Sequence, residues 1–132
     1  MKKTGILLTS ILLISLIGQI VYASTVNYAL TLPTIGTNYT NSCTKATTGT
    51  TAYNNCTFFG WSGSGVNEWV ERQSDNVDLT VTGWFSGAVN SSFGYLTPSA
   101  ASDNVGKSVH FAMKTDSSTW HQCDVKGTAD PK

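Results

Sequence analysis

Short runs of alternating apolar and polar residues recur along this chain, separated by turn-forming residues. The clearest is 77–85, with Val77, Leu79, Val81 and Phe85 at alternating positions. Because strand side chains point alternately to two faces, each run predicts a strand with one apolar face. We expect strands at 26–32, 66–73 (or one short helical turn there), 77–85, 93–97, 105–114 and 119–126. This spacing, without a convincing helical pattern, predicts an all-β fold, a small antiparallel β-sandwich, with a barrel-like sheet as the alternative.

Two prolines bound the predicted strands. Pro33 ends the first strand or marks it as an edge strand, and Pro98 ends the strand 93–97. The tetrapeptide Ser-Asp-Asn-Val occurs at 74–77 and again at 102–105, in each case before a predicted strand. Asp and Asn stabilise turns with their own side chains, so we interpret the repeat as turn chemistry.

The first residues have the three parts of a secretory signal peptide. Lys2 and Lys3 precede an apolar run that ends near Ile17, and Val21 and Ala23 provide the small-residue end. The apolar run can enter a membrane as a helix while the lysines hold its start on the inner side. We expect cleavage after Ala23, rather than an uncleaved anchor. This would leave a single secreted, extracellular β-domain, 24–132, preceded by a signal-peptide helix and free of any integral membrane span.

Charge is sparse in the expected secreted domain. Residues 24–132 contain six basic and eight acidic residues, a net charge of −2 with both histidines neutral. The basic residues form no patch, so we expect no nucleic-acid partner. They form no polybasic stretch for anionic lipid either.

The three cysteines suggest one disulfide. Gly49-Thr50 fits a type II′ hairpin turn, because glycine supplies the positive φ of its first central position. Pairing outward from this turn places Cys43 opposite Cys56, on a pair whose Cα atoms lie about 4.5 Å apart, which a disulfide allows. We therefore predict a Cys43–Cys56 bridge. The alternatives are a loop over 44–52 with different pairing, or an inter-sheet bridge from Cys56 to Cys123. An unpaired Cys123 permits a monomer or a Cys123-linked dimer.

Candidate catalytic and metal-binding residues are weak. The segment Gly106-Lys107-Ser108 lacks the preceding glycine of a phosphate loop, since Ala101 stands there. His121 and Cys123 would share a strand face near His110. A metal site, however, needs three or four supported ligands, and a thiol nucleophile needs a lowered pKa.

The acidic residues also offer no clear catalytic pair. The close pairs Glu68/Glu71 and Asp75/Asp78 fit solvated charge better than glycoside hydrolysis. We therefore expect no catalytic residues, no metal, no cofactor and no enzymatic activity.

The aromatic residues are the most suggestive functional feature. Trp84 falls on the polar side of its strand, and Trp69 lies opposite Val66 and Val70. If the apolar sides form the core, both rings lie outside, where they can stack on sugars or sit at a membrane interface. Covering by the other sheet or by loops is the alternative. We predict Trp69 and Trp84 as ligand-binding residues.

Several short motifs resemble one family. They are Lys45-Ala-Thr-Thr, Ala52-Tyr53, Ser62-Gly-Ser-Gly65, Trp69-Val-Glu71 and the closing strand pair 105–126. In these the chain resembles a domain-of-unknown-function family of small secreted β-rich proteins of Gram-positive bacteria. The resemblance implies a secreted all-β protein and no particular activity.

Together these features favour a secreted, non-enzymatic β-sandwich. We expect it to act by surface contact with a cell-envelope glycan or protein. The alternative is a bacteriocin or toxin-like protein that acts on membranes or envelope synthesis.

Overall fold

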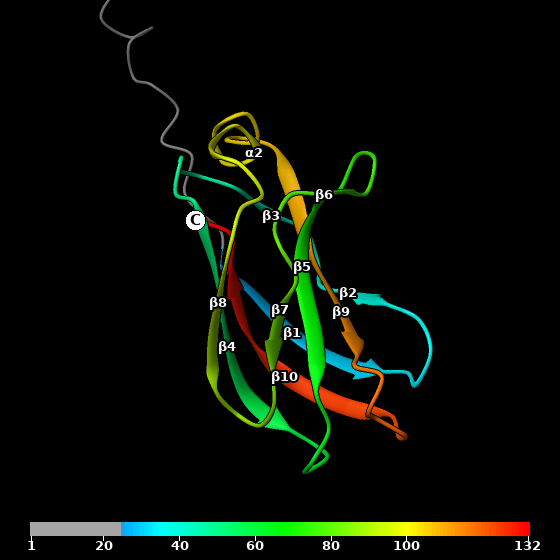
Figure 1. The fold of residues 1–132 in the computed structure, drawn as a ribbon. Helices are drawn as coiled ribbons and strands as arrows, with labels where there is room; N and C mark the ends of the chain where they lie inside the picture. The colour runs from blue at the N-terminus through cyan, green and yellow to red at the C-terminus, as the bar shows by residue number, and fades with distance from the viewer. Residues whose placement is uncertain (1–24) are drawn as a thin grey trace, which may run out of the picture.

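Two antiparallel β-sheets pack against each other in the computed structural model, which describes residues 25–132 (Figure 1). The predicted signal peptide, 1–23, and its helix lie outside the described residues. The two sheets do not close into one, which confirms the predicted all-β sandwich rather than the barrel-like alternative. The elements are β1 Val26–Leu32, β2 Asn38–Tyr39, β3 Cys43–Thr44, β4 Thr51–Phe59, β5 Val66–Arg72, β6 Val77–Asp78, β7 Gly83–Phe85, β8 Asn90–Gly94, α2 Pro98–Ser102, β9 Ser108–Thr115 and β10 Cys123–Asp130.

Each sheet combines strands that are distant in sequence. The first sheet has the order β1-β10-β4-β8. The second has the order β2-β9-β5-β6, with β3 also beside β9 and β7 also beside β5. The ends of the long strands are joined by loops at the two ends of the sandwich (Figure 1). Within 25–132, no helix is long and apolar enough to span a membrane.

Alternating side chains build the core between the sheets. In β1, Val26, Tyr28 and Leu32 are buried, as the pattern predicts, and β1 ends before Pro33 at the edge of the first sheet. In β9, Val109, Phe111 and Met113 are completely buried. The strands that the structure describes lie within 26–130, and the hydrophobic core cluster between them runs from Val26 to Ala129.

The run 77–85 is not the continuous strand that its pattern predicts. Both β6 and β7 pair with β5, but the segment between them leaves that ladder. Thr80 instead bridges to Tyr95 at the edge of the first sheet, while its hydroxyl accepts from the Val70 amide. Val81 in this segment is exposed, because the segment links two sheets rather than covering one. Val77 is also exposed, although it lies in β6 and pairs with β5.

The predicted Cys43–Cys56 bridge is wrong. All three cysteines are free and buried. Cys43 belongs to β3 in the second sheet, where it faces Val109, whereas Cys56 lies in the first sheet opposite Gly127. The Cys56–Cys123 alternative is also absent, and both residues belong to the same sheet. Cys123 is fully buried, which makes its thiol inaccessible to a second chain.

A buried lysine explains why the expected hairpin does not form. The Lys45 ammonium donates to the carbonyls of Thr47 at 2.7 Å and Gly49 at 2.9 Å. It also donates to the Lys132 carbonyl at 2.6 Å, beside β10. A buried ammonium requires such partners. Residues 45–50 thus form a crossover between the sheets, organised around this side chain, instead of a two-residue turn.

Further elements differ from the sequence expectations, and β9 begins at Ser108 rather than 105. The last strand begins at Cys123, not 119, and continues through the predicted tail to Asp130. Strand β8 begins at Asn90 rather than 93. The five-residue helix α2 was not expected. It begins where the Thr97 hydroxyl accepts from the Ala100 amide, with Pro98 in the first turn.

Candidate functional site

The outer surface of the second sheet carries both predicted tryptophans. Register pairing places Trp84, Asn67 and Lys114 in one row across β7, β5 and β9. The next row holds Trp69, Ala112 and Tyr39. We call the outward side chains of Tyr39, Asn67, Trp69, Trp84 and Lys114 the aromatic face. Trp84 is 58% exposed and Tyr39 is also exposed, whereas Trp69 is partly buried.

Two carboxylates hold the indole rings of this face. Trp84 donates its Nε1–H to Asp116 Oδ2 at 2.9 Å, and Trp69 donates its Nε1–H to Glu71 Oε1 at 2.7 Å. Hydrogen bonds to charged groups are the stronger ones in proteins. Each ring is thus fixed by its polar edge, which orients its faces.

Asp116 binds more than Trp84. Its carboxylate also accepts from the Ser118 amide and hydroxyl and from the Thr119 hydroxyl. The bonds from Ser118 and Trp84 lower the pKa of Asp116 to about 2, so it remains ionised near neutral pH. The β9–β10 turn therefore holds its acceptor ready for the Trp84 ring.

Glu71 also contacts a second side chain, that of His110. Its second oxygen lies 3.2 Å from His110 Nε2, and the His110 ring packs on Tyr39 with centroids 4.7 Å apart. Glu71 and His110 are buried beneath the aromatic face. The chain of contacts from Trp69 through Glu71 and His110 to Tyr39 couples the two aromatic side chains of one row.

Lys114 separates two shallow hollows beside these rings. Its Nζ lies 5.6 Å from the centroid of Trp69, a cation–π distance. One hollow, of about 380 Å³, is lined by Asn67, Trp69, Asp78, Thr82 and Lys114. The other, of about 460 Å³, extends from Lys114 to Ile35 and the Asp116 turn. The face thus combines ring surfaces with hydrogen-bonding groups.

A third carboxyl group lies on the opposite side of β5. Glu68 is completely buried between the sheets, where it accepts from Asn54 Nδ2 at 2.7 Å and from the Ser91 hydroxyl. Burial raises the pKa of Glu68 to about 7, against the lowering effect of these two hydrogen bonds. Its carboxyl group is enclosed, so a ligand on the outer surface cannot reach it.

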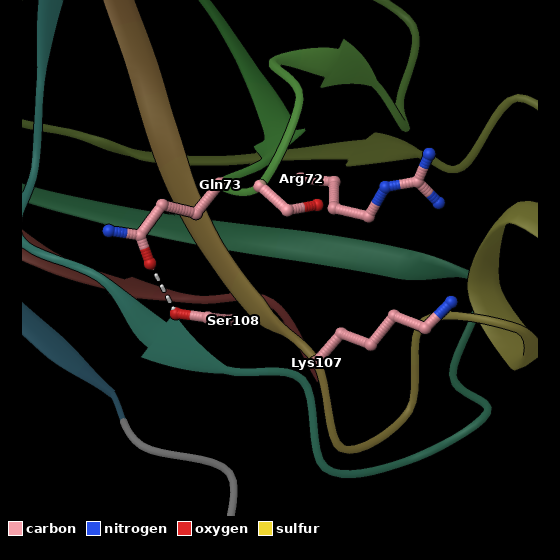
Figure 2. Close-up of a pocket in the computed structure, with 5 residues that line it drawn as sticks. Arg72, Gln73, Lys107 and Ser108 are labelled. Carbon is pink, nitrogen blue, oxygen red and sulfur yellow. Dashed lines mark hydrogen bonds between the residues drawn. The ribbon is translucent and has the colours of Figure 1, made fainter.

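Another pocket lies near the end of β5, away from the aromatic face. It has about 400 Å³ and is lined by Arg72, Gln73, Ser74, Lys107 and Ser108 (Figure 2). Figure 2 shows the Arg72 and Lys107 side chains extending toward the same side, and a hydrogen bond from Ser108 to Gln73. This is where the repeated Ser-Asp-Asn-Val turns meet.

Arg72 joins those two turns rather than presenting a free charge. It forms two hydrogen bonds with Asp75, at 2.8 and 2.6 Å, and one with Asn104 at 3.4 Å. A guanidinium matched in this way by a carboxylate has little capacity left for an external anion. We therefore assign the pocket to turn structure.

The other histidine and cysteine candidates are dispersed. His121 packs on Trp61 with ring centroids 4.3 Å apart, Cys123 is in the core, and His110 belongs to the second sheet. In the part of the chain that the structure describes, no group of three or more His, Cys, Asp and Glu residues is arranged to hold a metal ion.

Sequence reasoning identified the two tryptophans but not their partners. Glu71 shares the outward side of β5 with Trp69, and this spacing of two was the available signal. Tyr39, Lys114 and Asp116 lie far away in sequence. They reach the aromatic face only through the pairing of β9 with β2 and β5.

A scan of protein-family models and searches of curated proteins and of solved structures found no match to this chain. The resemblance to a secreted β-rich family therefore remains a prediction. Function has to be inferred from the geometry of the aromatic face.

Proposed function

We propose that this protein is a secreted, non-enzymatic β-sandwich that binds a cell-envelope glycan through the aromatic face. The observation that carries the proposal is the anchoring of both indole N–H groups, Trp84 on Asp116 and Trp69 on Glu71. Rings held in place lose little conformational freedom when a ligand stacks on them, which favours affinity.

The composition of the face suits a sugar. Pyranose rings offer apolar C–H surfaces for stacking on an aromatic ring, together with hydroxyl groups around their rim. Asn67, Thr82 and Lys114 lie beside the rings and provide donors and acceptors for those hydroxyls. An amphipathic ligand of this kind matches both components.

The charges favour an uncharged glycan over an acidic one. Lys114 is the basic residue of the aromatic face, while Asp78, Glu71 and Asp116 are acidic groups next to it. A polyanionic chain would meet more repulsion than attraction there. We therefore expect binding to neutral polysaccharides.

The proposed lack of enzymatic activity rests on how the nearby carboxylates are used. Glu71 and Asp116 accept the indole N–H groups, and Glu68 is enclosed in the core. Asp78 is then a single exposed carboxylate in the lining of the hollow. Glycoside hydrolysis needs two carboxyl groups that flank the substrate bond. These engaged and enclosed groups favour binding without cleavage.

A pull-down experiment tests the proposed function. Residues 24–132 would be incubated with insoluble neutral cell-wall polysaccharides, namely cellulose, chitin and β-1,3-glucan, and the bound fraction measured. We expect retention on at least one of them and a loss of at least about tenfold for Trp84→Ala, because an aromatic stacking surface is removed.

The control is Trp120→Ala, the same substitution at an exposed tryptophan outside the aromatic face. It should leave polysaccharide binding unchanged. Equal retention of the Trp84→Ala protein and the unmodified protein would contradict the proposal, as would failure of the unmodified protein to bind any of the three.

A further inference from the structure

Four loops gather at one end of the sandwich. Leu32 pairs with Cys123 and Phe59 with Val125, which places the loops after β1 and β4 beside the start of β10. Val66 pairs with both Thr115 and Phe85, which adds the loops after β9 and β7. Figure 1 shows these connections in the lower part of the view. We call residues 33–37, 60–65, 86–89 and 116–122 the loop end.

The loop end carries the most exposed large apolar side chains of the described part of the chain. Ile35 is 90% exposed and Trp120 is 85% exposed. Trp61, whose ring packs on His121, is 48% exposed. These apolar side chains come from three separate loops. Ile35 and Trp120 protrude from their loops, and Ile35 also lies at the rim of the hollow that reaches Lys114.

The loop end is also almost without charge. Its one Asp, Glu, Lys or Arg residue is Asp116. That carboxylate already accepts hydrogen bonds from Trp84, Ser118 and Thr119. Asp116 is therefore the one carboxylate of the loop end, and it has to stay on the water side when the apolar side chains of this end are covered.

The loops are held together by their own hydrogen bonds. The Asp116 amide donates to the Gly65 carbonyl at 2.9 Å, and the Gly65 amide donates to the Thr119 hydroxyl at 3.1 Å. The Ser64 amide donates to the Trp61 carbonyl at 3.2 Å. Satisfied backbone groups lower the cost of moving a loop out of water.

We propose that the loop end docks on the surface of a phospholipid bilayer whose headgroups carry no net charge, with the Ile35 and Trp120 side chains inserted at the interface. Tryptophan is enriched at membrane interfaces because its apolar ring and polar N–H match that boundary. A planar, soft surface accommodates protruding side chains from three loops at once. The lack of basic residues in these loops suits neutral headgroups and gives no attraction for anionic ones.

This surface adjoins the one proposed for glycan binding, because Ile35 lines the hollow that reaches Asn67 and Lys114 of the aromatic face. Trp120 is not among the residues that line this hollow. The membrane experiment contains no polysaccharide, and the polysaccharide experiment contains no lipid. Failure of one proposal is therefore separable from failure of the other.

Vesicle flotation tests the inference. Residues 24–132, which include every strand that the structure describes and the hydrophobic core cluster between them, would be mixed with vesicles of phosphatidylcholine alone, and the fraction that floats measured. We expect the double variant Ile35→Ser/Trp120→Ser to lose at least about tenfold in partitioning, because two apolar side chains leave the interface. Both side chains are exposed, so the fold should persist, which circular dichroism would verify.

A matched control removes exposed apolar surface at the opposite end. Val77 is 44% exposed and Leu96 is 53% exposed, and the double variant Val77→Ser/Leu96→Ser should float like the unmodified protein. Raising the salt to 0.5 M should also leave flotation unchanged, since no charge attraction is involved.

Three results would overturn the inference. They are absence of flotation with phosphatidylcholine vesicles, equal flotation of the Ile35→Ser/Trp120→Ser variant, and binding that requires anionic lipid and disappears in salt.

Discussion

Glu68 and Glu71 lie three residues apart on strand β5, point to opposite sides of the sheet and are both buried. Glu68 faces inward and accepts from an amide and a hydroxyl of the other sheet, Asn54 and Ser91. Glu71 faces outward and contacts the Trp69 indole and the His110 ring. Both glutamates are thus buried, but they have different roles, because Glu68 binds polar groups of the other sheet and Glu71 binds rings at the outer surface.

The inward carboxyl group ties the sheets together at an electrostatic cost. Asn54 accepts from the Tyr28 hydroxyl while donating to Glu68, so one polar network joins β1, β4, β5 and β8. The network satisfies every polar atom it contains, but its acceptor carries a charge that burial disfavours. The outward carboxylate, by contrast, supports rings at a surface. Substitutions on the inner side of β5 should therefore change the free energy of unfolding, and substitutions on the outer side should change polysaccharide binding.

The largest expected effect is a pH-dependent loss of stability caused by Glu68. The pKa of Glu68 is about 7 in the fold, above the ordinary value of 4.5 for an accessible glutamate. Below pH 4.5 Glu68 is protonated in the folded and the unfolded state, and its burial carries no penalty for charge. Between pH 4.5 and 7 the unfolded state ionises while the folded state stays protonated, so about 3 kcal/mol of stability is lost by the time the pH has passed 7.

Urea unfolding at pH 4.5 and pH 8 measures this effect against Glu68→Gln, which removes the charge. The glutamine oxygen can still accept from Asn54, and its amide N–H can donate to the Ser91 hydroxyl oxygen. The difference between the two proteins should grow by that amount at the higher pH. The titratable groups facing Glu68 are Tyr28 and Cys56, and burial raises the pKa of both, so neither ionises in this interval. An unchanged difference between pH 4.5 and 8 would show that Glu68 is not buried in this way.

The next effect concerns packing on the same inner side. A Cβ at Gly83 would lie 2.6 Å from Phe93 Cδ1 and 3.2 Å from Glu68 Cγ. We expect Gly83→Ala to lower the free energy of unfolding by about 2 kcal/mol, as overpacked cores do. Gly94→Ala is the control, because a Cβ there meets nothing closer than 3.8 Å. Equal unfolding midpoints for the two variants would argue against the close approach.

On the outer side, Gly65 offers a way to separate Trp84 from its acceptor while keeping the ring. A Cβ at Gly65 would collide with Asp116 Oδ2 and lie 2.6 Å from Trp84 Nε1. Gly65→Ala should therefore release the indole, and polysaccharide retention should fall by about tenfold, close to the value of one charged hydrogen bond. Retention would be measured below the unfolding temperature of the variant. If Gly65→Ala bound as well as Gly94→Ala, the fixed ring would not be what binds.

The smallest effect is expected at Glu71. Glu71→Ala leaves the Trp69 N–H without its acceptor and should weaken polysaccharide retention by about threefold. Glu71→Gln keeps an acceptor oxygen and should restore most of the binding. Isothermal titration with a soluble oligosaccharide of the retained polymer would measure both. The same loss in both variants would mean that Glu71 acts through its charge rather than by positioning Trp69.

The sequence predicted much of the strand pattern but less of the site. The sides of β1, β5 and β9 follow from alternation because it depends on neighbouring residues alone. The prediction of one continuous strand over 77–85 was wrong, because alternation cannot indicate that Thr80 pairs with the other sheet. The predicted pairing of Cys43 failed for the same reason. Gly49-Thr50 suits a hairpin turn, but the strand that contains Cys43 pairs with β9.

By itself, the sequence determined that this chain forms short strands with one apolar side and that Trp69 and Trp84 fall on the side away from the core. Only the tertiary structure decided which strands pair, and hence that Asp116 and Glu71 hold those rings and that Ile35 and Trp120 share one end. The physical reason is range. Alternation acts over a few residues, whereas strand partners are selected by contacts such as those of buried Lys45, which join residues up to 87 positions apart.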